Sequence, residues 1–247
     1  MHALGAIYTA TARQFRRDWM ALLFTLLLPV VMAAFFTMLF AGDPAGAGDV
    51  PPAQLYVPGM LSVGILWLGV FGTAPPLVQL RVQQVFRRVG ATPLRPAVLL
   101  AGQLAFRVTT GALQAALLLA YGMLAQGMRV QGSWAALILV VLLGSLLFVA
   151  LGCLLAALAR TNEAVIALGQ VVQFPMMFLS GTLFPLEMLP DFLRPVAAAM
   201  PLTYLNDALK QAMLGAPGLH PLWLDCAVLA GCLAVFALLA ARLFRWE

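Results

Sequence analysis

Polar side chains that could bind a solute lie inside strongly apolar stretches of this sequence, at spacings that place them on single helix faces. Gln103, Arg107, Thr110 and Gln114 follow one another at intervals of four, three and four residues, so on a helix they share one face. Polar residues within a membrane rarely face lipid, because the bilayer core cannot hydrate them. Such a face either packs against neighbouring helices or lines a route for a solute.

Two further stripes have the same character, one with amides and one with small residues. Small residues let helix backbones approach closely, and amides can hydrogen-bond between helices. Both stripes therefore fit two interpretations, interhelical packing or a substrate pathway, and the residues alone leave both open. The stripes are Gln170, Gln173, Met177 and Ser180, and Gly59, Ser62, Gly69 and Thr73.

The sequence shows no motif for ATP binding, serine catalysis or metal binding. A phosphate-binding P-loop needs Gly-Lys followed by Ser or Thr, but the single lysine, Lys210, follows a leucine. The two histidines, His2 and His220, lie at the edges of apolar stretches, where no serine nucleophile accompanies them. The three cysteines form no Cys-x-x-Cys pair and no Cys/His cluster. We therefore expect no catalytic residue, no bound cofactor and no metal ion in this chain.

The composition places these stripes in a membrane. Of the 247 residues, 63% are hydrophobic and 9% are charged, which excludes both a soluble domain and a disordered chain. A bilayer core requires about 20 apolar residues of helix, and six stretches meet that length. We predict an all-α integral membrane protein, with residues 1–247 as a single transmembrane domain. The predicted spans are Trp19–Ala41, Val57–Leu80, Ala97–Ala125, Trp134–Ala159, Ala164–Phe184 and Leu222–Arg242.

The positive charges predict the orientation. Basic residues gather in the N-terminal segment, in the links between spans 2 and 3 and between spans 4 and 5, and at the C-terminus. The other links carry only Arg129, Arg194 and Lys210. Cytoplasmic loops are enriched in Lys and Arg, so we expect both termini in the cytoplasm. The same rule explains the basic character without a nucleic-acid partner.

Two cytoplasmic segments and one outer segment have patterns of their own. Residues 1–18 and the link Arg81–Pro96 both show amphipathic helical spacing, and we predict that residues 1–18 form an interfacial helix. The link is either a helix anchored at the lipid surface or a docking surface for a cytoplasmic partner. Residues 185–214 are broken by prolines into two pieces too short to span. They are either a re-entrant hairpin dipping into the outer leaflet or a pair of interfacial helices lying flat.

Residues 173–210 closely resemble the signature region of the ABC-2 type permeases. The shared elements are an apolar span ending in Ser180-Gly181, then Phe184-Pro185, a Pro-anchored short helix at Pro190, and Pro201-Leu202-Thr203-Tyr204 before a second short helix. Arg87–Leu94, RRVGATPL, is similar to the family's cytoplasmic segment after span 2. The acidic stretch that usually precedes that segment is here Arg81-Val82-Gln83-Gln84, so contacts that depend on acids are not implied.

The resemblance implies a partner that supplies the energy. Such permeases dimerise, as homodimers or heterodimers, and associate with a dimer of cytoplasmic ABC ATPase subunits, which bind ATP and Mg²⁺. By resemblance, Arg81–Pro96 is the coupling helix and residues 185–214 form the outer gate. The coupling residues implied are Arg81, Phe86, Arg87, Arg88, Thr92 and Pro93, and the gate residues are Pro185, Pro190, Pro201, Tyr204 and Asp207.

The resemblance also implies a pathway and a location. Spans 1, 2 and 5 would line the route, which favours a substrate pathway along Ser62, Gly69 and Thr73 and along Gln170, Gln173, Met177 and Ser180. The cargo would be hydrophobic or amphipathic, such as a drug, a lipid or a lipid-linked glycan, exported by alternating access. The location would be a bacterial or archaeal plasma membrane.

Two alternatives from other classes remain. One is a non-transporting membrane sensor or assembly partner of an ATPase, which would show no directional flux. The other is an ion-coupled secondary carrier, against which the absence of acids in mid-span argues.

Overall fold

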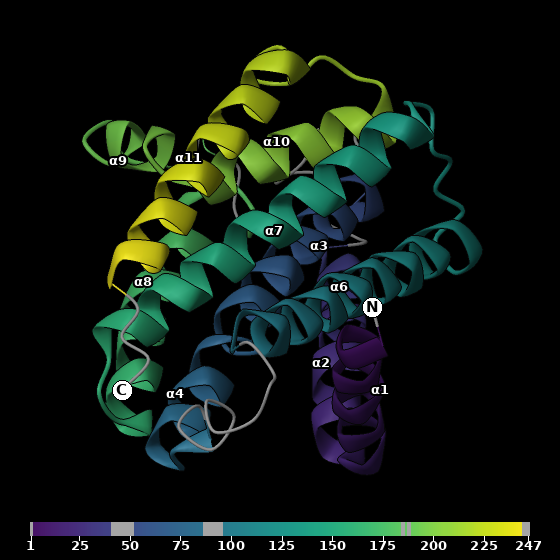
Figure 1. Cartoon of the computed structure of the whole chain (residues 1–247). Helices are drawn as coiled ribbons and strands as arrows, with labels where there is room; N and C mark the ends of the chain where they lie inside the picture. Colours follow the sequence, from purple (N-terminus) through teal and green to yellow (C-terminus); the bar gives the residue numbers. More distant parts are fainter. Residues whose placement is uncertain (1, 41–51, 86–95, 184–185, 187–188, 244–247) are drawn as a thin grey trace.

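The predicted spans are helical in a computed structural model, which describes residues 2–40, 52–85, 96–183, 186 and 189–243 (Figure 1). Within these residues the fold is all-helical, and six helices are long and apolar enough to cross a membrane. The helices are α1 (His2–Arg17), α2 (Trp19–Leu39), α3 (Pro52–Val70), α4 (Ala74–Val82), α6 (Pro96–Leu124), α7 (Trp134–Leu158), α8 (Asn162–Leu179), α9 (Arg194–Ala198), α10 (Pro201–Leu214) and α11 (Leu222–Leu243).

The second and fifth predicted spans differ from the observed helices. Span 2 consists of α3 and α4, separated by a turn at Phe71–Thr73, and Pro occupies the first positions of α4. Proline lacks an N–H and is favoured in the first turn of a helix, so the two prolines suit a new helix that begins there. The fifth span was predicted to reach Phe184, but α8 ends at Leu179 because Gly181 adopts φ +71°.

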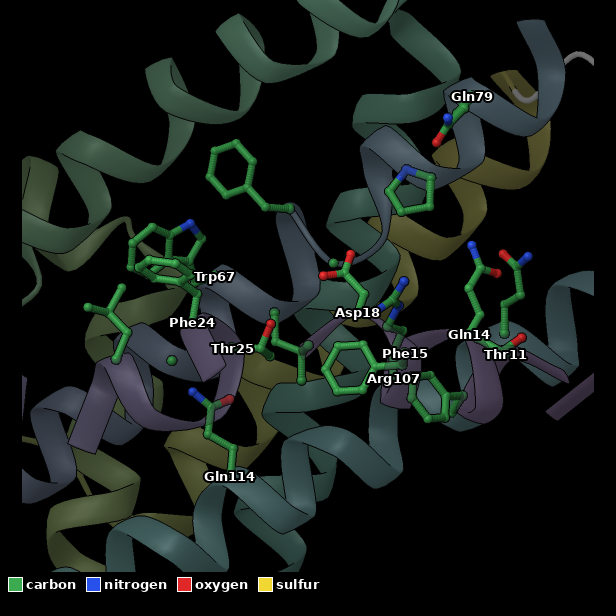
Figure 2. A pocket seen from close by; sticks show the side chains of 18 of the residues that line it. Thr11, Gln14, Phe15, Asp18, Phe24, Thr25, Trp67, Gln79, Arg107 and Gln114 are labelled. Carbon is green, nitrogen blue, oxygen red and sulfur yellow. The ribbon is translucent and has the colours of Figure 1, made fainter. Parts of the chain in front are cut away.

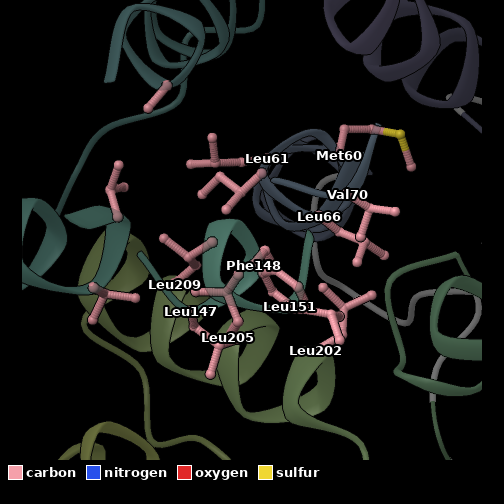
Figure 3. Close-up of a cluster of buried hydrophobic side chains, with 14 of the residues drawn as sticks. Met60, Leu61, Leu66, Val70, Leu147, Phe148, Leu151, Leu202, Leu205 and Leu209 are labelled. Carbon is pink, nitrogen blue, oxygen red and sulfur yellow. The ribbon is translucent and has the colours of Figure 1, made fainter. Parts of the chain in front are cut away.

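The hydrophobic core lies where α3, α7 and α10 meet (Figure 3). Figure 3 shows side chains of α3, such as Leu61 and Leu66, facing Phe148 of α7 and Leu205 of α10. All four of these side chains are fully buried. α11 packs along α7 on the other side, as Figure 1 shows. This core fixes α10 against the spans even though α10 is too short to cross a bilayer.

Large apolar side chains also cover much of the outer surface of the helices. Phe24 and Met38 of α2, Val171 of α8 and Leu238 of α11 are each more than half exposed. In water such exposed apolar patches would favour aggregation, whereas in a bilayer they contact apolar lipid tails. The surface therefore agrees with the membrane environment that the composition predicts.

Two contacts fix which helix ends share a face. The Arg81 guanidinium donates a hydrogen bond to the Ala159 carbonyl, so the end of α4 lies at the end of α7. At the opposite end of α7, the backbone N–H of Gln131 donates a hydrogen bond to the Met213 carbonyl at 2.9 Å. This bond joins the link before α7 to the end of α10. Spans that alternate in direction require this arrangement, because successive links then lie on opposite faces of the bundle. The structure fixes the relative order of the two faces, and the cytoplasmic assignment stays a prediction.

Candidate functional site

A cavity of about 790 Å³ lies between α1, α2, α3, α4 and α6. Figure 2 shows its wall, with Trp67 and Phe24 on one part and Arg107, Asp18 and Phe15 on another. The break between α3 and α4 contributes Gly72, and α1 packs on α6 through the edge contact of Phe15 with Phe106 at 5.4 Å. The helix break and the N-terminal helix therefore create this space.

The cavity combines aromatic surface with amides and one charge of each sign. Its amide-bearing residues are Gln14, Gln79, Gln83, Gln103 and Gln114. Gln114 is 1% exposed, and its side-chain carbonyl oxygen has no hydrogen-bond partner. An unsatisfied buried polar atom costs about 1–3 kcal/mol, so a donor on a bound molecule would remove that cost. The site offers apolar contact area and a few convergent polar groups, which is the usual character of a small-molecule site.

The polar stripe of α6 supplies one side of this cavity. Gln103, Arg107 and Gln114 line it. Thr110 is buried instead, and its hydroxyl donates to the Phe106 carbonyl within its own helix at 2.9 Å. The spacing of the stripe thus brings three of four polar residues together.

Gly69 of the small-residue stripe lies against α7, whereas Gly59 lies against Thr182 beyond the end of α8. A Cβ at Gly69 would collide with the backbone of Phe148, and one at Gly152 would collide with the Gly69 carbonyl and the Thr73 side chain. The Ser62 hydroxyl donates to the Pro58 carbonyl one turn earlier at 3.0 Å. This arrangement matches the packing interpretation in the single chain, and a pathway role for Ser62, Gly69 and Thr73 stays a prediction.

The stripe of α8 divides between surface and interior. Gln170 is exposed and Met177 is half-buried, whereas Gln173 and Ser180 are buried. Beyond the helix end, the Asn206 amide of α10 donates to the Gly181 carbonyl at 2.8 Å. This bond fixes the end of α8 on α10. A pathway role for these α8 residues also stays a prediction.

Among the coupling residues, the structure describes Arg81 alone. α4 runs through Val82 and a turn follows, with Gln84 at φ 54°, so the amphipathic segment does not begin as one continuous helix at Arg81. Phe86, Arg87, Arg88, Thr92 and Pro93 lie outside the described residues.

Pro201, Tyr204 and Asp207 lie on α10, at the opposite end of α7 from Arg81. Pro201 begins α10, the Tyr204 hydroxyl donates to the Ala198 carbonyl at 2.8 Å, and Pro190 is exposed. The Asp207 carboxylate accepts hydrogen bonds from the backbone amides of Leu219 and His220, each at 3.0 Å. Pro185 lies outside the described residues. Whether α9 and α10 dip into the membrane or lie on it stays open.

Several cavity residues were not predicted from the sequence. Asp18, Trp67 and Gln79 line the cavity, yet none belongs to a polar stripe. The amphipathic pattern of residues 1–18 was a usable signal, because a helix that packs on a span also brings its polar face to the bundle. The break at Phe71–Thr73 gave only the Pro75-Pro76 pair as a hint.

Comparisons with known proteins agree with this architecture. The model of the ABC-2 type transporter family matches residues 2–214. The daunorubicin resistance ABC transporter permease protein of Streptomyces coeruleorubidus is 28% identical over 226 residues, covering 89% of this chain and 77% of that protein. An inner membrane transport permease of Escherichia coli is 24% identical, covering 86% and 83% of the two chains. Nodulation protein J of Rhizobium meliloti is 28% identical, covering 75% and 72%.

The chain belongs to the ABC-2 type transporter family, since the family match covers most of its length. It is an integral membrane protein and a permease subunit of an ABC transporter. The predicted family and fold class are thereby confirmed.

Proposed function

We propose that this chain exports a hydrophobic or amphipathic molecule from the cytoplasm or the inner leaflet, driven by a separate ABC ATPase. ATP and Mg²⁺ bind the ATPase, whose closure moves this chain between inward-open and outward-open states. Two copies of the chain form the permease, in a bacterial or archaeal plasma membrane with both termini in the cytoplasm.

The observation that carries this proposal is the cavity beside α6. Its volume of about 790 Å³ falls within the range of about 300–1,000 Å³ that is usual for drug-sized ligands. Aromatic walls suit an apolar body, and Arg107 and the glutamines suit a polar end. One relative is named for daunorubicin resistance. An amphipathic drug has an apolar body and a polar end, which would match these two parts of the cavity wall.

The position of the cavity supports coupling to a cytoplasmic partner. α4 contributes Gln79 to the cavity wall and Gln83 follows its last residue, while the Arg81 side chain of α4 donates a hydrogen bond at the end of α7. A push on the segment after α4 would reach both the cavity and the bundle core through this one short helix. We infer a separate ATPase chain because residues 1–247 contain no P-loop and the family match is to a permease.

Filling the cavity tests the proposal. Thr25→Trp places a large side chain at the cavity wall, whereas Phe35→Trp places the same indole at an exposed position of the same helix. Both variants are reconstituted with the ATPase, and stimulation of ATP hydrolysis by daunorubicin is measured. We expect Thr25→Trp to raise the drug concentration for half-maximal stimulation about tenfold, and Phe35→Trp to leave it unchanged. Equal behaviour of the two variants would contradict a substrate role for the cavity.

A further inference from the structure

Four polar side chains meet at the corner between α10 and α11, on the face opposite Arg81. Asp207 and Gln211 lie one turn apart on α10, His220 lies in the connecting segment, and Asp225 lies in the first turn of α11. The Asp207 carboxylate holds the connecting segment through the amides of Leu219 and His220. The chain therefore places an imidazole between two carboxylates.

Two buried atoms in this cluster have no hydrogen-bond partner. They are Nδ1 of His220 and Oδ1 of Asp225. They lie 3.8 Å apart, and Nδ1 lies 4.0 Å from Oδ2 of Asp207. Asp225 is completely buried, and the side chain of Asp207 is 6% exposed. An unpaired oxygen of a fully buried carboxylate thus faces an unpaired imidazole nitrogen.

Two buried carboxylates that lie within 4.8 Å of the same imidazole nitrogen favour a proton or a cation between them. An isolated buried carboxylate is costly, and a second one nearby raises the cost further. Gln211 relieves part of it, since its amide donates to Oδ2 of Asp225 at 2.8 Å and to Oδ2 of Asp207 at 3.3 Å. Neither bond reaches Oδ1 of Asp225 or Nδ1 of His220. The cluster lacks a group that binds these two atoms at once.

We propose that Asp207, His220 and Asp225 bind a Zn²⁺ ion. Their ligand atoms all lie within 4.8 Å of one another. A point equidistant from three atoms that lie up to 4.8 Å apart is at most about 2.8 Å from each, so the ligands would move inward by several tenths of an ångström to reach the usual Zn²⁺–N and Zn²⁺–O distances. Imidazole with carboxylates suits Zn²⁺, whereas Mg²⁺ and Ca²⁺ prefer oxygen ligands alone. The two carboxylates balance the charge of the ion.

The surroundings also match a metal centre. Gln211 orients both carboxylates, and the Tyr204 ring stacks on the His220 ring at 5.3 Å. Such outer contacts hold ligands in place for the ion. The His220 side chain is 34% exposed, which leaves an entry path and room for water as a fourth ligand. The bound ion would join α10 to α11 and stabilise the outer end of the bundle.

Zn²⁺ binding is measured on the purified full-length chain in detergent, carrying an affinity tag without histidines. Titration against a chromophoric chelator gives affinity and stoichiometry, and Co²⁺ substitution gives a visible spectrum that distinguishes nitrogen and oxygen ligands from thiolates. We expect one ion per chain, a Co²⁺ spectrum without thiolate charge-transfer bands, and a melting temperature that rises with Zn²⁺ concentration.

Two ligand variants and one matched control complete the test. His220→Ala and the isosteric Asp225→Asn should each weaken Zn²⁺ binding at least tenfold and remove the rise in melting temperature. Asp191→Asn changes an exposed carboxylate and should bind like the unmodified chain. Absence of binding in the unmodified chain, unchanged binding in both ligand variants, or a thiolate-type Co²⁺ spectrum would overturn the proposal.

Discussion

Gln114 has a buried side chain whose amide oxygen makes no hydrogen bond. Its carbonyl oxygen faces no donor although the residue is 1% exposed. The same amide occupies the space in which a Cβ at Gly64 would lie, so α3 and α6 are packed closely around it. A residue that costs stability and lines a cavity is expected where function requires it.

Replacing this amide separates function from stability. Gln114→Leu removes the unsatisfied oxygen and keeps most of the volume, so we expect the melting temperature to stay the same or rise. Substrate-stimulated ATP hydrolysis should require about tenfold more substrate, the equivalent of roughly one hydrogen bond to a ligand. Gln126→Leu, at an exposed position after α6, is the matched control. A fall in melting temperature with unchanged substrate dependence would show that Gln114 serves packing only.

At the scale of elements, the approach of α3 to α7 depends on Gly69 and Gly152. Both positions bring the backbone of one helix against the other, and a backbone cannot move aside as a flexible side chain can. This contact also holds Phe148 in the core beneath α10. We therefore expect this helix pair to be the most rigid part of the bundle.

Gly152→Ala should destabilise the fold. The added methyl group would collide with the Gly69 carbonyl and Thr73, and overpacking of this kind costs about 1–3 kcal/mol. Gly231→Ala places the same group in open space on α11, where alanine's higher helix propensity leaves stability unchanged or improved. Thermal unfolding in detergent compares the two. Equal melting temperatures would contradict the close α3–α7 approach.

α4 connects the cavity, which Gln79 lines, to the end of α7, which Arg81 contacts. Arg81→Met removes the bond to the Ala159 carbonyl and keeps the apolar stem of the side chain. We expect ATP hydrolysis by the partner to continue while the number of molecules transported per ATP falls several-fold. Arg160→Met removes a neighbouring exposed charge and should retain coupling. Parallel loss of hydrolysis and transport in Arg81→Met would indicate an assembly defect instead.

For the whole molecule, the sequence predicted the six helices well because each apolar stretch has the length that a bilayer requires. It did not predict the features that depend on tertiary contacts, such as one helix end and the cavity. The end of α8 depends on the turn at Gly181. The cavity depends on α1 packing against α6, and the amphipathic pattern of residues 1–18 indicates a packing face without showing which span it meets. The sequence placed His220 at the edge of an apolar stretch and indicated no role for Asp225. Their meeting depends on the connecting segment folding back onto Asp207, which sequence spacing does not show.

The orientation of the molecule is a separate prediction. Reporter enzymes that are active only on one side of the membrane, fused after the C-terminus and before residue 1, should both report the cytoplasm. A third fusion within residues 215–221 should report the outside, because these residues lie on the opposite face from Arg81. Reporters on different sides at the two termini would contradict the even number of spans.

The central claim is that this chain is the membrane subunit through which a separate ATPase drives export. The most direct measurement is uptake of daunorubicin by proteoliposomes that contain the chain and its ATPase, with the nucleotide-binding face outward. Uptake should require ATP, Mg²⁺ and both proteins, and Thr25→Trp should reduce it. The account would be contradicted by uptake without the ATPase, or by ATP hydrolysis stimulated by the chain with no net movement of any amphipathic substrate tested.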